Sequence, residues 1–144
     1  SENRESYRQM FSVVFNDFYL FESLLGLVAP DLDSQARAYL KRFQLERDVE
    51  IRNGELSTTD LSKGQRKRLA MIVSLLEERP IYVFDEWAAD QDVHFREVFY
   101  AEILPRLKRE GRTVIAVTHD EKYWHLCDRR IVMDLGGLAP APAA

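Results

Sequence analysis

Hydrophobic residues recur along the chain with two alternating periods, one typical of strands and the other of helices. Runs rich in β-branched and aromatic residues predict strands at Phe11–Phe15, Ile81–Phe84, Thr113–Thr118 and Arg130–Met133. Ile81–Phe84 is apolar at almost every position, which is typical of a strand buried on both faces of a parallel sheet.

Apolar residues at helical spacing predict helices between these strands. Helices are expected from an N-cap at Asp33 or Ser34 through Phe43, from Ser62 to Leu76, from Asp92 to just before Gly111, and from Glu121 to Leu126. Pro105 should bend or weaken the third helix, because it cannot donate a hydrogen bond to the carbonyl of Ala101. The alternation of strands and helices predicts an α/β fold with a parallel sheet and right-handed crossovers.

Composition narrows the class of protein without identifying it. The 144 residues are enough to bury a core, and no apolar run reaches the ~20 residues that cross a bilayer. The net charge of −4 argues against a bulk nucleic-acid binder. Cys127 is the one cysteine of this sequence, which excludes an internal disulfide. The Ala/Pro-rich stretch from Leu138 to Ala144 predicts a disordered tail.

The strand at Ile81–Phe84 runs into two adjacent acids, Asp85 and Glu86. Both would lie at the carboxyl edge of the sheet, where open α/β sheets bind ligands. One carboxylate of such a pair can hold Mg²⁺ through water while the other orients or deprotonates an attacking water molecule. The alternative is structural, with Asp85 capping the next helix and Glu86 solvated.

The motif LSKGQ opens the helix that begins at Ser62. Ser62 and Gln65 fit a capping box. The serine hydroxyl, the amides near Gly64 and the positive end of the helix also form an anion site, to which Lys63 adds charge. Capping alone explains the serine and the glutamine, so both interpretations stay open. The basic run Arg66–Arg68 faces either an anion or water.

His119 follows the strand that ends at Thr118. A histidine at this edge of the sheet can hydrogen-bond to a phosphate, and it lies on the same edge as Asp85 and Glu86. A lone histidine there is more often an ordinary loop residue. His119 becomes a candidate site residue because Asp85 and Glu86 are expected at the same edge.

In order and spacing these segments resemble the nucleotide-binding domain of ABC transporters over residues 7–137. Leu61–Ala70 is similar to the family's signature, with Lys63 replacing its first glycine, and Ile81–Glu86 is similar to the Walker B strand. Ala89–Asp92 takes the place of the D-loop and His119 that of the switch histidine. The resemblance implies part of a P-loop NTPase (RecA-like) parallel α/β sheet with the ABC α-helical subdomain.

The resemblance also implies a role for each site residue. Asp85 would hold Mg²⁺ through water, Glu86 would be the general base, and His119 would contact the γ-phosphate of ATP. Asp92 would help couple two active sites. Asn16 stands where the family has its Q-loop glutamine and is one methylene shorter, which weakens direct contact with Mg²⁺.

The signature residues would bind ATP held by the opposite subunit of a head-to-tail dimer: Ser62, Lys63, Gly64 and Gln65. The implied organisation is residues 1–16 for a core strand and the Q-loop region, 17–76 for the helical subdomain with the signature helix, 77–137 for the RecA-like core, and 138–144 for the tail. The implied partners are a transmembrane domain, which docks near residues 17–43, and a second nucleotide-binding domain. No nucleic acid is expected, and the implied location is the cytoplasmic face of the bacterial inner membrane.

The segment Asp85–Asp92 (DEWAADQD) is similar to a variant found in bacterial exporters of cyclic peptides and siderophore precursors. Trp87 replaces a proline there and is expected to pack against the Walker B turn. Because these exporters fuse the ATPase behind a membrane domain, the resemblance implies an exporter of peptide or siderophore-type cargo.

The sequence contains no G-x-x-x-x-G-K-[ST] loop, which in this family cradles the phosphates of ATP. We therefore expect a fragment that hydrolyses no ATP alone, although the complete domain would be an ATPase. In the family the Walker A strand lies beside the strand that precedes His119. We expect its absence to expose edges and an apolar face, so that the chain is marginally stable, self-associates, swaps elements or moves its last strand into the gap.

Two other functions fit less well. A soluble ABC-type ATPase of DNA repair or translation would carry long coiled-coil insertions or basic arms, whereas the interval from Asn16 to Leu61 is short and the chain acidic. A catalytically inert interaction fragment would use the signature helix only as a dimer surface. Glu86 and His119 favour descent from an active enzyme.

Overall fold

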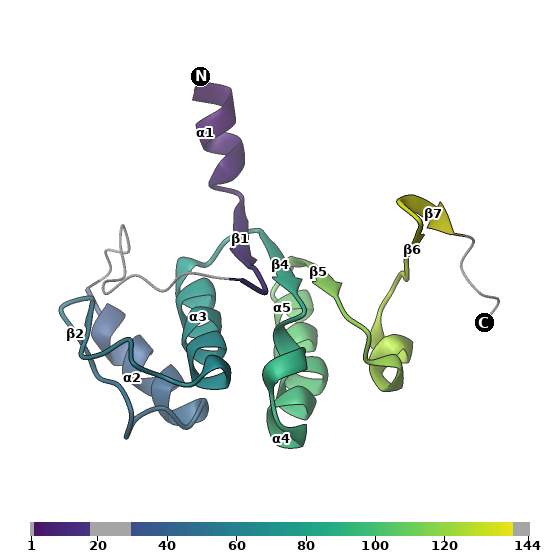
Figure 1. The fold of residues 1–144 in the computed structure, drawn as a ribbon. Helices are drawn as coiled ribbons and strands as arrows, with labels where there is room; N and C mark the ends of the chain where they lie inside the picture. Colours follow the sequence, from purple (N-terminus) through teal and green to yellow (C-terminus); the bar gives the residue numbers. More distant parts are fainter. Residues whose placement is uncertain (1, 18–29, 140–144) are drawn as a thin grey trace.

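The central sheet has three parallel strands in the order β1-β4-β5 (Figure 1). The structure is a computed structural model that describes residues 2–17 and 30–139. The strands are β1 (Phe11–Val14), β4 (Ile81–Asp85) and β5 (Thr113–Val117). Strand β4 pairs with a neighbour on each side, which confirms the parallel α/β fold. Its residues alternate between buried and partly buried, so the burial expected on both faces of the Ile81–Phe84 run is complete on one face only among the described residues.

Helices cover one face of this sheet. They are α3 (Lys63–Glu77), α4 (Val93–Glu97) and α5 (Leu104–Arg109), while α2 (Leu32–Arg42) packs on α3 and α1 (Glu2–Arg8) precedes β1 (Figure 1). Side chains alternate across strands, so Val14 and Phe84 point into the core with Leu69 of α3 and Phe99. Ser12 of β1 and Ser74 of α3 share a buried hydrogen bond of 2.7 Å between their hydroxyl oxygens.

The other face of the sheet is apolar and uncovered by the described residues. Val13, Val83 and Ile115 form one row across the three strands. Val13 is 39% exposed and Ile115 51%. This agrees with the expectation of an exposed apolar face. The last strand has not moved to the free edge of β5: β6 (Val132–Asp134) pairs antiparallel with β7 (Gly137–Ala139) instead.

Two boundaries near the C-terminus differ from prediction. The predicted strand Arg130–Met133 begins only at Val132. The tail predicted from residue 138 is wrong at Leu138 and Ala139, because both pair with β6 across a turn in which Gly136 has φ +78°. Residues 140–144 lie outside the described residues. The helix predicted at Glu121–Leu126 is present as the 3-10 helix η3.

The N-cap predicted for the second helix is also wrong. Helix α2 begins at Leu32, after Asp31. The Asp33 carboxylate accepts hydrogen bonds from the backbone N–H groups of Asn53 (2.7 Å) and Gly54 (3.2 Å). These amides lie in the turn between β2 (Ile51–Arg52) and β3 (Glu55–Leu56), so Asp33 joins the helix to a hairpin far along the chain.

The helix from Asp92 to Arg109 is continuous but changes its winding before Pro105. Residues Val98–Ile103 form the π-helical segment η2 between α4 and α5. Proline lacks the N–H that an α-helix would direct to Ala101, and a π-helical segment accommodates that loss. The irregularity expected at Pro105 therefore takes the form of a π-helical segment just before it. Within the described residues no helix is both long and apolar enough to cross a membrane.

Candidate functional site

The carboxyl ends of the three strands bring together the polar residues that the sequence singled out. Asn16 follows β1, Asp85 ends β4 with Glu86 next, and His119 comes shortly after β5. Because parallel strands end at the same edge of a sheet, one surface carries all four side chains.

Glu86 and His119 contact each other directly. Nε2 of His119 lies 3.0 Å from Oε1 of Glu86. Glu86 has a left-handed backbone (φ 50°, ψ 36°), and its amide donates to the carbonyl of Val117 at 3.0 Å. This conformation is unfavourable for a residue with a Cβ, so the surrounding contacts must hold it. His119 is 87% exposed and Glu86 32%, which leaves both accessible to a ligand.

Asp85 is partly buried, and its carboxylate makes no hydrogen bond or ion pair with the described residues. It therefore has free oxygen ligands at the sheet edge. The described residues contain no group of three or more side chains that could hold a metal by themselves. A hydrated Mg²⁺ takes few protein ligands and completes its shell with water and phosphate oxygens, so a single free carboxylate fits that ion.

The signature segment forms the capping box predicted for it. The backbone N–H of Gln65 donates to Oγ of Ser62 (3.2 Å), and the N–H of Ser62 donates to Oε1 of Gln65 (2.9 Å). Lys63 is 53% exposed and pairs with Asp90 at 3.2 Å. Gly64 packs so closely that an added Cβ would lie 2.9 Å from the carbonyl oxygen of Asp90.

The segment after Glu86 forms the 3-10 helix η1 (Trp87–Asp90), which packs on α3. Trp87 is 1% exposed, stacks on Phe99 at 4.9 Å and donates from Nε1 to the carbonyl of Lys67 at 2.8 Å. The predicted packing role of this tryptophan is confirmed. Asp92 caps α4 by accepting from the N–H of Phe95 at 2.9 Å, also as predicted.

The basic run after the signature does not simply face an anion or water. Lys67 is completely buried, and its Nζ donates to Oδ1 of Asn16 at 2.9 Å. Arg68 lies over the ring of Phe95 at 4.3 Å. Lys67 was missed as a site residue, although its spacing of four from Met71 places it on the buried face of the helix.

Tyr100 is a second residue that sequence reasoning missed. Its hydroxyl lies 2.5 Å from Oγ1 of Thr118 and donates to Oδ2 of Asp120 at 2.8 Å, so it holds the loop on both sides of His119. Its ring stacks on Tyr123 at 4.1 Å. Burial raises the pKa of Tyr100 above its ordinary value, so the hydroxyl keeps its proton further into the alkaline range.

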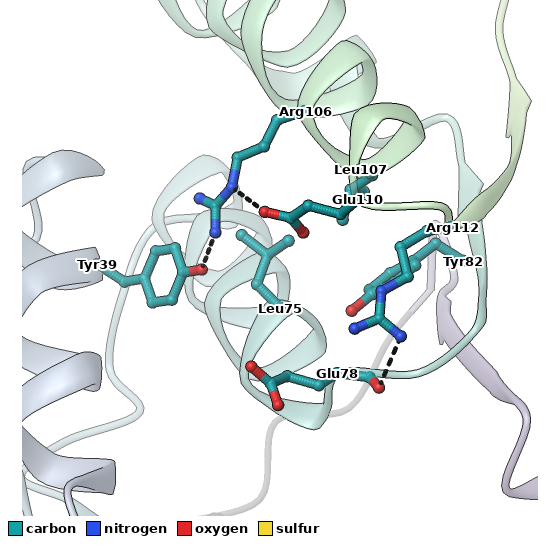
Figure 2. Close-up of a pocket in the computed structure, with 8 residues that line it drawn as sticks. All are labelled: Tyr39, Leu75, Glu78, Tyr82, Arg106, Leu107, Glu110 and Arg112. Atoms are coloured by element: carbon teal, nitrogen blue, oxygen red, sulfur yellow. Dashed lines mark hydrogen bonds and ion pairs between the residues drawn. The ribbon is translucent and has the colours of Figure 1, made fainter.

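A pocket of about 180 Å³ lies away from this edge and contains none of the predicted site residues. Figure 2 shows Arg106 turned toward Glu110 and Tyr39, and Arg112 turned toward the backbone of Glu78. Nε of Arg106 donates to Glu110 at 2.8 Å and its terminal nitrogen to the Tyr39 hydroxyl at 3.1 Å. Arg112 donates to the carbonyl of Glu78 at 3.3 Å. Because the pocket lies away from the strand ends and is lined by none of the predicted site residues, we do not assign it as the active site.

Comparison with known proteins agrees with the geometry. The sequence matches the ABC transporter family over residues 1–89. It is 50% identical over 133 residues to the ATP-binding protein SyrD of Pseudomonas syringae pv. syringae, covering 90% of this chain and 24% of SyrD. It is 30% identical over 145 residues to the energy-coupling factor transporter ATP-binding protein EcfA2 of Mycoplasmoides gallisepticum, covering 94% of this chain and 45% of EcfA2.

Among solved structures, cbiO1 of Clostridium perfringens, part of the ABC transporter complex cbiONQ, is similar with a TM-score of 0.69 and 25% identity. That comparison covers 96% of this chain and 59% of cbiO1. The chain thus spans about a quarter of SyrD and less than two thirds of the other two proteins.

Proposed function

Because this chain belongs to the ABC transporter family, we propose that it is the part of a transporter's ATP-hydrolysing domain that carries the catalytic base and the signature surface. The observation that carries the proposal is the contact between Glu86 and His119, beside the free carboxylate of Asp85. A base that is hydrogen-bonded to a second polar group at the ligand-binding edge of a sheet suits hydrolysis of a phosphoanhydride.

Glu86 would accept the proton of the attacking water, and His119 would orient that carboxylate while its ring faces the γ-phosphate. Asp85 would hold Mg²⁺ through water. An Mg²⁺ ion held there would supply positive charge to offset the charge that develops on the phosphate oxygens. Asn16 would not reach the metal in the observed arrangement, because its amide oxygen is engaged by Lys67.

The signature residues would act on the nucleotide of a second subunit. Lys63 is more than half exposed and adds positive charge at the N-terminus of α3, which already favours anions. The hydroxyl of Ser62, the amide of Gly64 and the side chain of Gln65 lie at the same helix end. Asp92 would couple the two subunits from the loop that follows η1.

The Walker A loop must come from residues other than these 144, which contain no such motif. The apolar row through Val13 and Ile115 and the free edge of β5 are surfaces that such a segment could cover. This chain alone is therefore expected to release no phosphate from ATP. Below, the complete domain means this chain joined to the polypeptide that supplies its Walker A loop.

For the whole protein we propose an exporter whose membrane domain docks near residues 17–43, with the ATPase at the cytoplasmic face of the bacterial inner membrane. The 1–16, 17–76 and 77–137 division belongs to the same proposal. The DEWAADQD segment at Asp85–Asp92 and the 50% identity to a bacterial ATP-binding protein support it. A cyclic-peptide or siderophore-type cargo follows from the same segment.

The test is Glu86→Gln in the complete domain, with ATP turnover as the readout. Loss of the base should lower kcat by about 10² or more, since positioned general bases contribute about that much. Glu102→Gln is the matched control, because Glu102 is exposed and pairs only with Arg42 among the described residues. Unchanged turnover in the Glu86 variant would leave this chain as an interaction module.

A further inference from the structure

The feature that the proposed function does not use is Lys67, on the second turn of α3. Its side chain has no exposed surface. Among the described residues it is the one charged side chain classed as buried. Removing an ammonium group from water is costly unless oxygen atoms replace its hydration shell.

Three oxygen atoms surround the Lys67 ammonium. Nζ donates to Oδ1 of Asn16 at 2.9 Å and to the backbone carbonyl of Glu86 at 2.9 Å. It also pairs with Oδ2 of Asp90 at 2.6 Å. An ammonium group has three N–H donors, so each donor has a partner.

The three acceptors belong to different functional segments. Asn16 lies in the loop after β1, Glu86 follows β4, and Asp90 ends η1. The backbone carbonyl of Lys67 itself accepts from Nε1 of Trp87 at 2.8 Å. One residue of the signature helix is therefore hydrogen-bonded to the loop after β1 and to the base and the D-loop after β4.

The hydrogen bond from Lys67 to the Glu86 carbonyl affects the direction of the Glu86 carboxylate. Glu86 is held at φ 50°, a conformation that a residue with a side chain rarely adopts. Its N–H donates to the carbonyl of Val117, and its C=O accepts from Lys67 and, at 3.2 Å, from the N–H of Ala89, so both ends of its backbone are restrained. The direction of the carboxylate toward His119 depends on that backbone conformation.

Stability alone does not account for this lysine. Replacing a whole buried ion pair by apolar side chains of similar volume is often neutral or stabilising, so a fold of this kind does not need the pair for its stability. Asp90 has 27% of its side chain exposed and can be hydrated without the lysine. The ammonium is the single point at which these three polar loop groups meet.

We propose that Lys67 is a positioning residue that sets the backbone of Glu86 and thereby aims the catalytic carboxylate, while tying the Asn16 loop and the D-loop to the signature helix. The proposal rests on the assignment of Glu86 as the base. On this proposal Lys67 connects the signature helix to the catalytic carboxylate of the same chain. The proposed function places that helix against a second subunit.

The first measurement is the kinetics of Lys67→Met in the complete domain. We expect kcat to fall by about tenfold to a hundredfold, since a base misplaced by about an ångström loses that much. The KM for ATP should change by less than about twofold, because Lys67 is buried away from any nucleotide. The control is Lys108→Met, which removes an exposed lysine paired with Asp128. A Lys67→Met variant with normal kcat would overturn the proposal.

The second measurement is hydrogen–deuterium exchange on the same variants. Exchange should rise about tenfold in the segment 85–92 and stay unchanged in the 69–76 part of α3. Unchanged exchange at 85–92 would overturn the proposal even if kcat falls. If Lys67→Met does not fold, Asp90→Asn removes the anion from the same cluster, and it should loosen the same segment; no change there also contradicts the proposal.

Glu86→Gln, measured alongside, separates the two proposals. If it retains full turnover, the assigned base is wrong, whereas the exchange data still show whether Lys67 holds the loops. If it abolishes turnover while Lys67→Met affects neither kcat nor exchange, the base assignment stands and the role of Lys67 fails.

Discussion

Nε2 of His119 lies 3.0 Å from Oε1 of Glu86, although the two residues are 33 positions apart in the sequence. Strands β4 and β5 are adjacent and parallel, and each delivers one of the two side chains to the same edge. Tyr100 fixes the loop on both sides of His119, and Lys67 fixes the backbone of Glu86. The pair is therefore held from both sides by residues that are themselves buried.

Replacing His119 should remove this contact with little effect on folding, because the imidazole is 87% exposed. His119→Ala in the complete domain is expected to lower kcat by about 10² or more, within the range for positioned acid–base groups. His125→Ala is the control, since His125 is also exposed and lies in η3. Equal turnover in the two variants would remove His119 from the site.

Gly64→Ala tests the packing between the signature helix and the D-loop. In an open helix this change would stabilise by about 1 kcal/mol. Here the new Cβ would lie 2.9 Å from the carbonyl oxygen of Asp90, so a net loss of about 1–3 kcal/mol is expected, as for overpacked sites. Urea denaturation measures it. Gly137→Ala meets only an ordinary contact of 3.7 Å and serves as the comparison; a stabilised Gly64 variant would contradict the observed packing.

The Asp90 carboxylate predicts a dependence of stability on pH. Its hydrogen bond with Lys67 lowers the pKa of Asp90 below the ordinary 3.8. A depressed pKa means that Asp90 stabilises the fold above pH 3.8 and that this stability is lost as the pH falls through the folded-state pKa. Unfolding free energies measured from pH 6 to pH 2 should therefore fall less steeply for Asp90→Asn than for the parent chain. An Asp90→Asn variant with the same slope as the parent chain would contradict this prediction.

The uncovered sheet face predicts self-association of this chain. Ile115 is 51% exposed and Val13 39%, in one row across the sheet, and exposed apolar surface of this kind favours association. Sedimentation should show concentration-dependent oligomers that Ile115→Glu reduces. Leu138→Glu, which removes an even more exposed apolar residue (75%) from β7, should leave them unchanged. A monodisperse monomer of the parent chain would contradict the prediction.

Local sequence features predicted local structure well. The capping box of Ser62 and Gln65 spans three residues, so its geometry follows from the helix start alone. Asp92 could be predicted as a cap for the same reason. The actual role of Asp33 could not be predicted in this way. Its amide partners, Asn53 and Gly54, lie in a hairpin turn about 20 residues further along the chain, and the sequence near Asp33 gives no sign of them.

The sequence by itself determined the parallel strands, the signature helix and the gathering of Asp85, Glu86 and His119 at one edge, because hydrophobic period and the alternation of strands with helices are encoded in short segments. Only the tertiary structure decided what holds that edge together. In the sequence Lys67 belongs to a basic run expected to face an anion or water. In the fold its ammonium contacts three oxygen atoms, from Asn16, Glu86 and Asp90. A buried charge is stable only where such partners converge, and their convergence depends on contacts far apart in the chain.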